Sequence, residues 1–254
     1  MPGHAVWGPI LEQWILLLVA ALGAGALSGV IGTGASLLLL PLLVPMFGAV
    51  EAIPIMAVAG FMANLSRALA WWRSIAWRAV FAYSLPGMPA AALGAYTLVH
   101  LPRGWPEMLL GLFIMALVPL RRLVMKAIVS INLVQMAVVG AIIGFLTGLF
   151  LSTGPLSVPA FLALGLVRGA FIATEATASL IVQMAKIVSF HEFGAISMVD
   201  LARGAAIGLA LMLGTFAIRP LVARIRDHHF RAMMDVVTLV SGLWLLVFRL
   251  FQTA

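Results

Sequence analysis

Two polar pairs recur inside apolar segments, and each pair combines an amide with a cation. Asn64 and Arg67 are three residues apart, and Gln183 and Lys186 repeat this spacing about 119 residues later. Residues three apart share a helix face, so each pair presents an amide beside a positive charge. This combination suits an oxyanion, which carries charge and accepts several hydrogen bonds. A cation at membrane depth usually marks a functional pathway or an ion pair, although snorkelling toward a membrane surface is the alternative.

Two short stretches of small and hydroxyl residues interrupt the apolar sequence, one in each half of the chain. The first is Gly-Thr-Gly-Ala-Ser at 32–36, and the second is Ser-Thr-Gly-Pro at 152–155. A half-helix that begins after such a break offers free N–H groups and a dipole that favour an anion. Matching breaks in two halves indicate a transport site. The expected substrate-binding residues are therefore Gly32, Thr33, Gly34, Ala35, Ser36, Asn64, Arg67, Ser152, Thr153, Gly154, Gln183 and Lys186.

Glu175 is the only acid that we expect within a span and away from its ends. It begins a polar stripe that continues through Ser179 and Gln183 to Lys186. Roughly 16 Å of straight helix separates Glu175 from Lys186, so the two should not pair directly. Glu175 can carry a coupling proton, because burial favours the neutral carboxyl. Alternatively, it bonds a neighbouring helix or Arg168.

No motif for catalysis or for a resident cofactor is present. The chain has no cysteine, and no second histidine follows His191-Glu192 at the spacing of a zinc protease. We find no serine–histidine–acid set at membrane depth and no phosphate loop for ATP. A cation transporter would be expected to carry acids at the breaks, and none is there. We therefore expect no catalytic residue, no metal and no cofactor.

The elements that must position these residues are membrane-spanning helices. The chain is 64% hydrophobic and only 9% charged, with a mean hydropathy of +1.17, which no soluble domain matches. Its net charge of +7 reports orientation in the membrane rather than nucleic-acid binding. We expect one all-α membrane domain over residues 1–254. The predicted helices are Trp14–Ile31, Leu37–Phe47, Ala52–Trp72, Trp77–Val99, Trp105–Leu120, Ala127–Leu151, Leu156–Leu166, Ala170–Phe190, Ile196–Ile218 and Phe230–Phe248.

Loop charge decides how many of these helices cross the membrane. If the short pieces Leu37–Phe47 and Leu156–Leu166 both cross, the chain has ten spans, and its basic residues gather on one side. That side carries Arg73, Arg78, Arg121, Arg122, Lys126, Arg168, Arg219, Arg224, Arg226 and Arg231, whereas the other keeps Arg103, Arg203 and Arg249. Positive charge favours the cytoplasmic side. The sequence thus predicts ten spans with both termini on the outer, periplasmic side.

Each half then has five crossings. Because five is an odd number, the second half starts on the opposite side of the membrane and is inverted relative to the first. Repeat one spans about 14–122 and repeat two about 127–250, each with a broken, short first hairpin. Gly25-x-x-x-Gly29 matches Gly144-x-x-x-Gly148, and Gly94 matches Gly214, at offsets of 118 to 120. We interpret the first four of these glycines as close helix-packing contacts. Inverted repeats around a central site are typical of secondary transporters that work by alternating access.

The segment Gly-x-Gly-Ala-Ser-x4-Pro at Gly32–Pro41, its echo before Pro159, and the later Asn/Gln-x-x-Arg/Lys resemble the TauE/SafE sulfite exporter family. The resemblance covers about Leu16 to Val247. It implies a secondary transporter of sulfite, sulfonates or related organosulfur anions in the cytoplasmic (inner) membrane, usually directed outward. Members typically carry a more glycine-rich break than this chain has at either position. The expected partners are a small anion, the lipid bilayer and protons as a coupling ion, and the chain can be a monomer or a homodimer.

Other functions compete with this hypothesis. The substrate can be another small anion, such as a carboxylate. A membrane scaffold that transports nothing would tolerate bulky residues in the Gly32 and Gly154 regions. An intramembrane enzyme lacks a credible nucleophile or metal set in this sequence.

Overall fold

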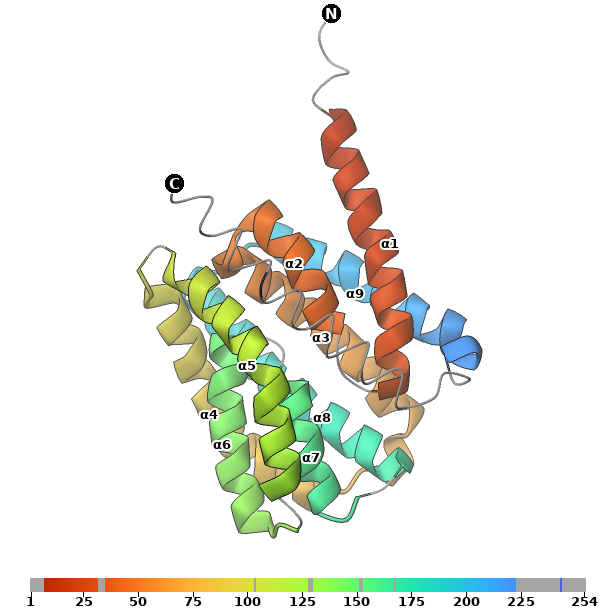
Figure 1. Cartoon of the computed structure of the whole chain (residues 1–254), viewed down its shortest axis with the longest axis vertical. Coiled ribbons are helices and arrows are strands. Elements are labelled where there is room, and N and C mark those ends of the chain that lie inside the picture. Colours follow the sequence, from red (N-terminus) through yellow and green to blue (C-terminus); the bar gives the residue numbers. More distant parts are fainter. Residues whose placement is uncertain are drawn as a thin grey trace, which may run out of the picture.

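The computed structural model describes residues 7–31, 35–102, 104–127, 130–150, 153–166, 168–222 and 243. Within these residues the chain forms nine α-helices and one short 3-10 helix (Figure 1). In chain order they are α1 (Trp7–Ile31), α2 (Ala35–Phe47), α3 (Ala49–Ala70), η1 (Trp72–Ser74), α4 (Trp77–His100), α5 (Trp105–Ala127), α6 (Leu133–Leu149), α7 (Gly154–Ala163), α8 (Arg168–Glu192) and α9 (Met198–Val222).

The first nine predicted helices correspond to these nine helices, and the tenth, Phe230–Phe248, lies outside the described residues. Helices α3, α8 and α9 contain apolar stretches long enough to cross a membrane, and five further helices hold shorter apolar stretches. The chain is therefore a helical, multi-pass membrane protein. Ten crossings and the orientation of the termini remain predictions.

Local chemistry explains where several helices begin and end. Asn132 and Gln135 form a reciprocal capping box, so α6 begins at Leu133 rather than at the predicted Ala127. Gly48, with a φ of 77°, separates α2 from α3. Gly165, with a φ of 82°, follows α7 in the same left-handed region, where a side chain would be strained.

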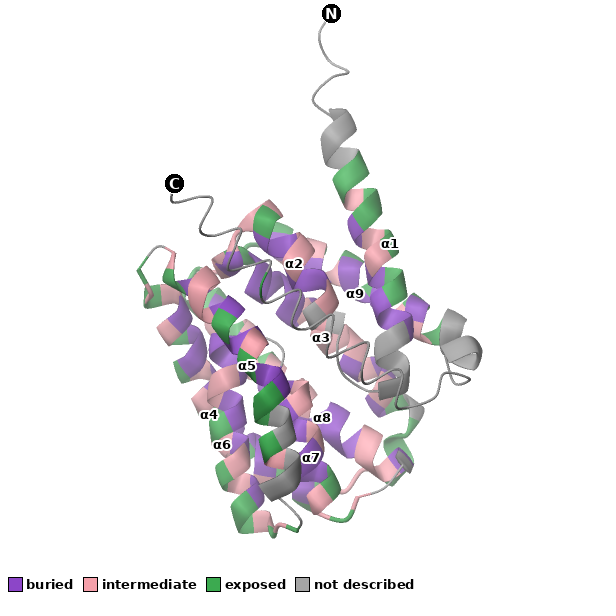
Figure 2. Cartoon of the chain, viewed as in Figure 1, coloured by how far each residue is buried: buried purple, intermediate pink, exposed green. Residues whose placement is uncertain are grey.

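The outward faces of the helices are apolar. Leu85 on α4, Val134 on α6 and Leu213 on α9 are each more than half exposed. Figure 2 shows buried and exposed residues alternating along the helices, with the buried ones gathered where helices meet. Such a surface is unsuited to water but is expected where a protein faces lipid.

The main helix contacts join the first half of the chain to the second half (Figure 1). Helix α4 packs along α6, and α1 packs along α9. Helix α3 contacts both α8 and α9, and α4 also contacts α8. Contacts between neighbours in the sequence, such as α1 with α2, are less extensive. The two halves are therefore interleaved rather than folded as separate bundles.

Glycines bring α4 and α6 into backbone contact. A side-chain carbon at Gly94 of α4 would overlap the backbone of Phe145 and Gly148 on α6. A side-chain carbon at Gly148 would in turn meet the backbone of Ala91 on α4, and Gly144 faces Gly87 in the same way. The close-packing interpretation of Gly144 and Gly148 is confirmed.

The same kind of contact joins α1 to α9. Gly25 of α1 lies against the backbone of Leu211, and Gly214 of α9 lies against the backbone of Leu22. The Thr215 hydroxyl donates a hydrogen bond of 2.9 Å to the Gly25 carbonyl. Gly25 is therefore a packing residue, as the sequence predicts.

Candidate functional site

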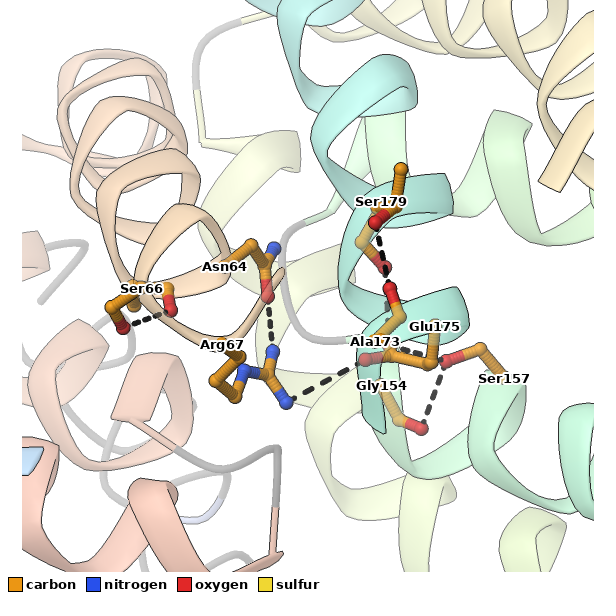
Figure 3. Close-up of polar contacts among 10 residues, drawn as sticks. Asn64, Ser66, Arg67, Gly154, Ser157, Ala173, Glu175 and Ser179 are labelled. Carbon is orange, nitrogen blue, oxygen red and sulfur yellow. Dashed lines mark hydrogen bonds and ion pairs between the residues drawn. The ribbon is translucent and has the colours of Figure 1, made fainter. Parts of the chain in front are cut away.

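Arg67 lies near the C-terminal end of α3 and faces α8 (Figure 3). One terminal nitrogen of its guanidinium donates a hydrogen bond to the side-chain oxygen of Asn64, one turn earlier on α3. The other lies 3.5 Å from a carboxylate oxygen of Glu175 on α8. The amide and the cation that the sequence placed on one face are thus in direct contact. Both are turned into the protein, and only 12% of the Arg67 side chain is exposed.

The Glu175 carboxylate is held by three helices. Its Oε2 pairs with Arg67 of α3, while its Oε1 accepts hydrogen bonds from Ser157 of α7 at 3.3 Å and from Ser179 of α8 at 3.1 Å. Glu175 is 3% exposed. It therefore bonds two neighbouring helices, which is one of the roles that its sequence position allows.

The second break borders this cluster. Thr153 precedes the first residue of α7, Gly154, and is buried. The Ser157 hydroxyl lies 3.1 Å from the Gly154 carbonyl oxygen as well as near Glu175. Across the break, the Thr153 hydroxyl forms a hydrogen bond of 2.6 Å with the hydroxyl of Thr147 on α6. The start of α7 thus lies between Glu175 on one side and the end of α6 on the other.

Lys186 is fully buried and binds the end of α6. Its Nζ donates hydrogen bonds to the carbonyl oxygens of Thr147, at 2.5 Å, and Phe150, at 2.7 Å. It also lies 5.4 Å from the centre of the Phe190 ring. The C-terminal end of a helix carries partial negative charge, so it stabilises an ammonium group. Lys186 therefore does not snorkel, and its bonds reach the same helix end that precedes the second break.

The other predicted residues are placed as follows. The Gln183 side chain packs against Gly60 of α3, and its Oε1 is buried without a hydrogen bond from any described residue. Ser36 is half-buried in α2, and Ala35 is the first residue of that helix. Gly32, Thr33, Gly34 and Ser152 lie outside the described residues. The described part of the site thus comes from α3, α6, α7 and α8.

A comparison with protein families identifies the group to which the sequence belongs. The model of the family described as "Sulfite exporter TauE/SafE" matches residues 17–245. The chain belongs to the TauE/SafE sulfite exporter family. The resemblance of the sequence to this family is thereby confirmed. Neither the curated proteins nor the solved structures contain a significant match. TauE/SafE proteins are membrane transporters, so this chain is a transporter and not an enzyme.

Two polar residues of this TauE/SafE protein were missed by the sequence analysis. Ser157 bonds Glu175, and its signal was its position three residues after Gly154, on the same face of a short apolar helix. The Thr147 carbonyl accepts a hydrogen bond from Lys186, and the Thr147 hydroxyl shares a hydrogen bond with the Thr153 hydroxyl. A backbone carbonyl has no sequence signature, so only the threonine itself, inside an apolar segment, could have pointed there.

Chemically, the TauE/SafE site combines a guanidinium, an amide and hydroxyl groups in a buried setting. A planar guanidinium binds carboxylates and oxyanions through several parallel N–H groups. Asn64 orients the Arg67 guanidinium by accepting one of its hydrogen bonds. The site can hold and orient an anion.

Proposed function

We propose that the protein is a secondary transporter that moves a small sulfur-containing anion, such as sulfite or a sulfonate, out of the cell by alternating access. The observation that carries this proposal is Arg67, whose side chain is only 12% exposed, lies at the contact between α3 and α8 and is oriented by Asn64. Membership of a family of sulfite exporters supports the class of substrate. A largely buried guanidinium is a suitable place for an oxyanion, and so is the start of a helix.

We propose that the anion binds Arg67 and Asn64 on one side and the start of α7, at Thr153 and Gly154, on the other. The Ser157 hydroxyl lies within hydrogen-bond distance of both the Gly154 carbonyl and Glu175, the partner of Arg67. This link supports a shared site. In this proposal the first break, residues 32–36 with Ser36 at its end, faces the anion from the opposite side. In the same proposal, Ser152 and Gln183 complete the set of residues that surround the anion.

Lys186 has a different part in this proposal. Two of its three ammonium protons are directed to carbonyls of α6. We propose that it mainly fixes the end of α6, and thereby the second break, while its charge adds to the positive potential of the site.

Ten crossings in two inverted repeats are also part of the proposal. The helix pairing supports it, because the contacts of α4 with α6 correspond to those of α9 with α1 if each repeat has five helices. The glycine contacts support it too: Gly94 of α4 lies against the α6 backbone, and its match Gly214 of α9 lies against the α1 backbone. An arrangement with both termini outside follows the loop charges.

The interleaved packing suggests which bodies move. Helix α9 packs with α1 and α3, and α4 packs with α6 and α8. We propose that these two mixed groups rock against each other at the α3–α8 contact. The Arg67–Glu175 pair lies at that contact, so motion there changes the surroundings of the anion directly.

The test is transport of labelled sulfite and of labelled sulfonates in proteoliposomes that contain the purified full chain. Arg67→Gln removes the cation and should lower the rate by about tenfold or more, since a lost charge-assisted hydrogen bond costs roughly 1.5–3 kcal/mol. Arg78→Gln removes an exposed cation of α4 and serves as the control. Unchanged transport by the Arg67 variant would reject the cationic site.

A carboxylate is the second candidate substrate. The observation that favours it is that Arg67 already pairs with a carboxylate, that of Glu175. A guanidinium alone does not separate a carboxylate from a sulfonate. Competition of unlabelled carboxylates against labelled sulfite decides between the two, because the true substrate class will compete at the lower concentration.

A further inference from the structure

The group that now holds Arg67 is itself an anion. Glu175 places one carboxylate oxygen 3.5 Å from the guanidinium that, in the proposed function, binds the transported anion. A guanidinium that already binds a carboxylate has fewer N–H groups available to bind a second anion. We propose that Glu175 is an internal competitor for Arg67, which the transported anion displaces, and that the displaced carboxylate takes up one proton from solvent. This inference rests on the proposed anion site at Arg67.

The contacts of Glu175 permit such an exchange without moving its helix. Its second oxygen is held by the hydroxyls of Ser157 and Ser179, independently of Arg67. A hydroxyl both donates and accepts hydrogen bonds. A neutral Glu175 can therefore donate its new O–H to one serine and accept from the other. The carboxyl group keeps its place while Arg67 turns to the anion.

Charge balance explains why the proton is needed. Among the described side chains, Arg67 is the only cation that forms an ion pair with Glu175. Tyr83 on α4 interacts electrostatically with Glu175, α6 and α7 contain no titratable residue, and Arg73 of η1 is exposed. Lys186, on the same helix as Glu175, is bonded to α6.

When the anion binds Arg67, Glu175 would be left as a buried charge with no paired cation among the described side chains. Such a charge is strongly unfavourable, and neutralisation is the ordinary outcome. Each bound monoanion then brings one proton with it. The substrate-bound site carries the same net charge as the empty one, because the Glu175 charge is replaced by that of the substrate.

The experiment measures binding of methanesulfonate to the detergent-purified full chain by calorimetry, in buffers of different ionisation enthalpy. Methanesulfonate keeps one negative charge between about pH 5.5 and 8, so protons taken up on binding belong to the protein. For the wild type we expect an uptake of about one proton per anion. We also expect affinity to increase by up to about tenfold per pH unit as the pH falls. This measurement needs no variant.

Glu175→Gln removes the competing charge and keeps the shape. It should bind methanesulfonate about tenfold more tightly if Glu175 releases Arg67 for only about a tenth of the time in the wild type. Its proton uptake should be close to zero and its affinity independent of pH. Glu192→Gln changes an exposed acid at the end of the same helix and should match the wild type.

The outcomes separate the inference from the proposed function. No proton uptake by the wild type, or a Glu175→Gln variant that binds no more tightly, would overturn the inference while anion binding itself stands. If Arg67→Gln binds the anion as well as the wild type does, both the proposed anion site and the inference are overturned. Failure of the wild type to bind both methanesulfonate and sulfite would do the same.

Discussion

Arg67 and Lys186 occupy equivalent positions in the sequence pattern but are stabilised by different chemistry. Arg67 is neutralised by a carboxylate of another helix. Lys186 is held by two carbonyl oxygens at the end of α6 and lies near an aromatic ring. A competing anion can open the Arg67–Glu175 pair because the released carboxylate can take up a proton, whereas removing Lys186 from the α6 carbonyls leaves two buried acceptors without that partner. The first cation is therefore suited to binding and the second to holding structure.

Replacement of Lys186 by Met tests its structural role. The variant loses two hydrogen bonds from a charged donor and leaves two buried carbonyl groups without that partner, so we expect a loss of about 2 kcal/mol in unfolding free energy. The measurement is thermal unfolding in detergent. Arg78→Met, at an exposed position of α4, should change stability by less than about 0.5 kcal/mol. Normal stability combined with lost anion binding would instead assign Lys186 to the substrate.

Part of this arrangement could be predicted from spacing alone. The interval of three residues puts Asn64 beside Arg67 on one helix face, and their contact is observed. The partners across helices could not be predicted, because no local pattern says which helix faces α3. Glu175 has two plausible roles in the sequence, and only the fold brings it to Arg67.

At the scale of elements, small residues decide which helices touch. Gly94 on α4 and Gly214 on α9 each allow a backbone of the other half of the chain to approach. Membrane helices gain little from burying apolar side chains, since lipid is equally apolar, so close packing is the main source of specificity. The sequence predicts the helices well because their apolar runs are long. It does not predict that α4 packs with α6 or α1 with α9, because a face of small residues does not specify which helix packs against it.

A pair of glycines on α1 provides a matched test of this packing. Gly25→Val places side-chain atoms against the backbone of Leu211 and should destabilise the protein by about 1–3 kcal/mol, through forced separation of the helices. Gly23→Val lies on the same helix with nothing within 4 Å of the added carbon. It should leave stability nearly unchanged. Thermal unfolding and the monodisperse fraction in size-exclusion chromatography measure both, and equal effects would refute the role of Gly25.

At the scale of the whole molecule, basic residues gather at one end of the predicted spans. The cluster includes Arg73 and Arg78, which follow α3 and begin α4. Acidic residues such as Glu51 and Glu192 lie at the opposite ends of their helices. This asymmetry predicts that the loop between α3 and α4 is cytoplasmic and that the end of α8 faces outward.

The orientation can be read with single cysteines, because the natural chain has none. Glu192→Cys should react with a membrane-impermeant maleimide on intact cells. Ser74→Cys, which is exposed in η1, should react only after the membrane is permeabilised. The reverse pattern would overturn the predicted topology, and the cysteine-free parent chain gives the background.

The interleaving of the two halves also has a consequence for synthesis of the protein. The Gly25 carbonyl of α1 bonds Thr215 of α9, which lies 190 residues later in the chain. At about 5–20 residues per second, a ribosome needs roughly 10 to 40 s to make that stretch. Throughout this interval the glycine face of α1 has no permanent neighbour and must be covered by lipid or by the insertion machinery. Helix α1 thus enters the membrane well before α9 exists, and it is fixed in place only late in synthesis.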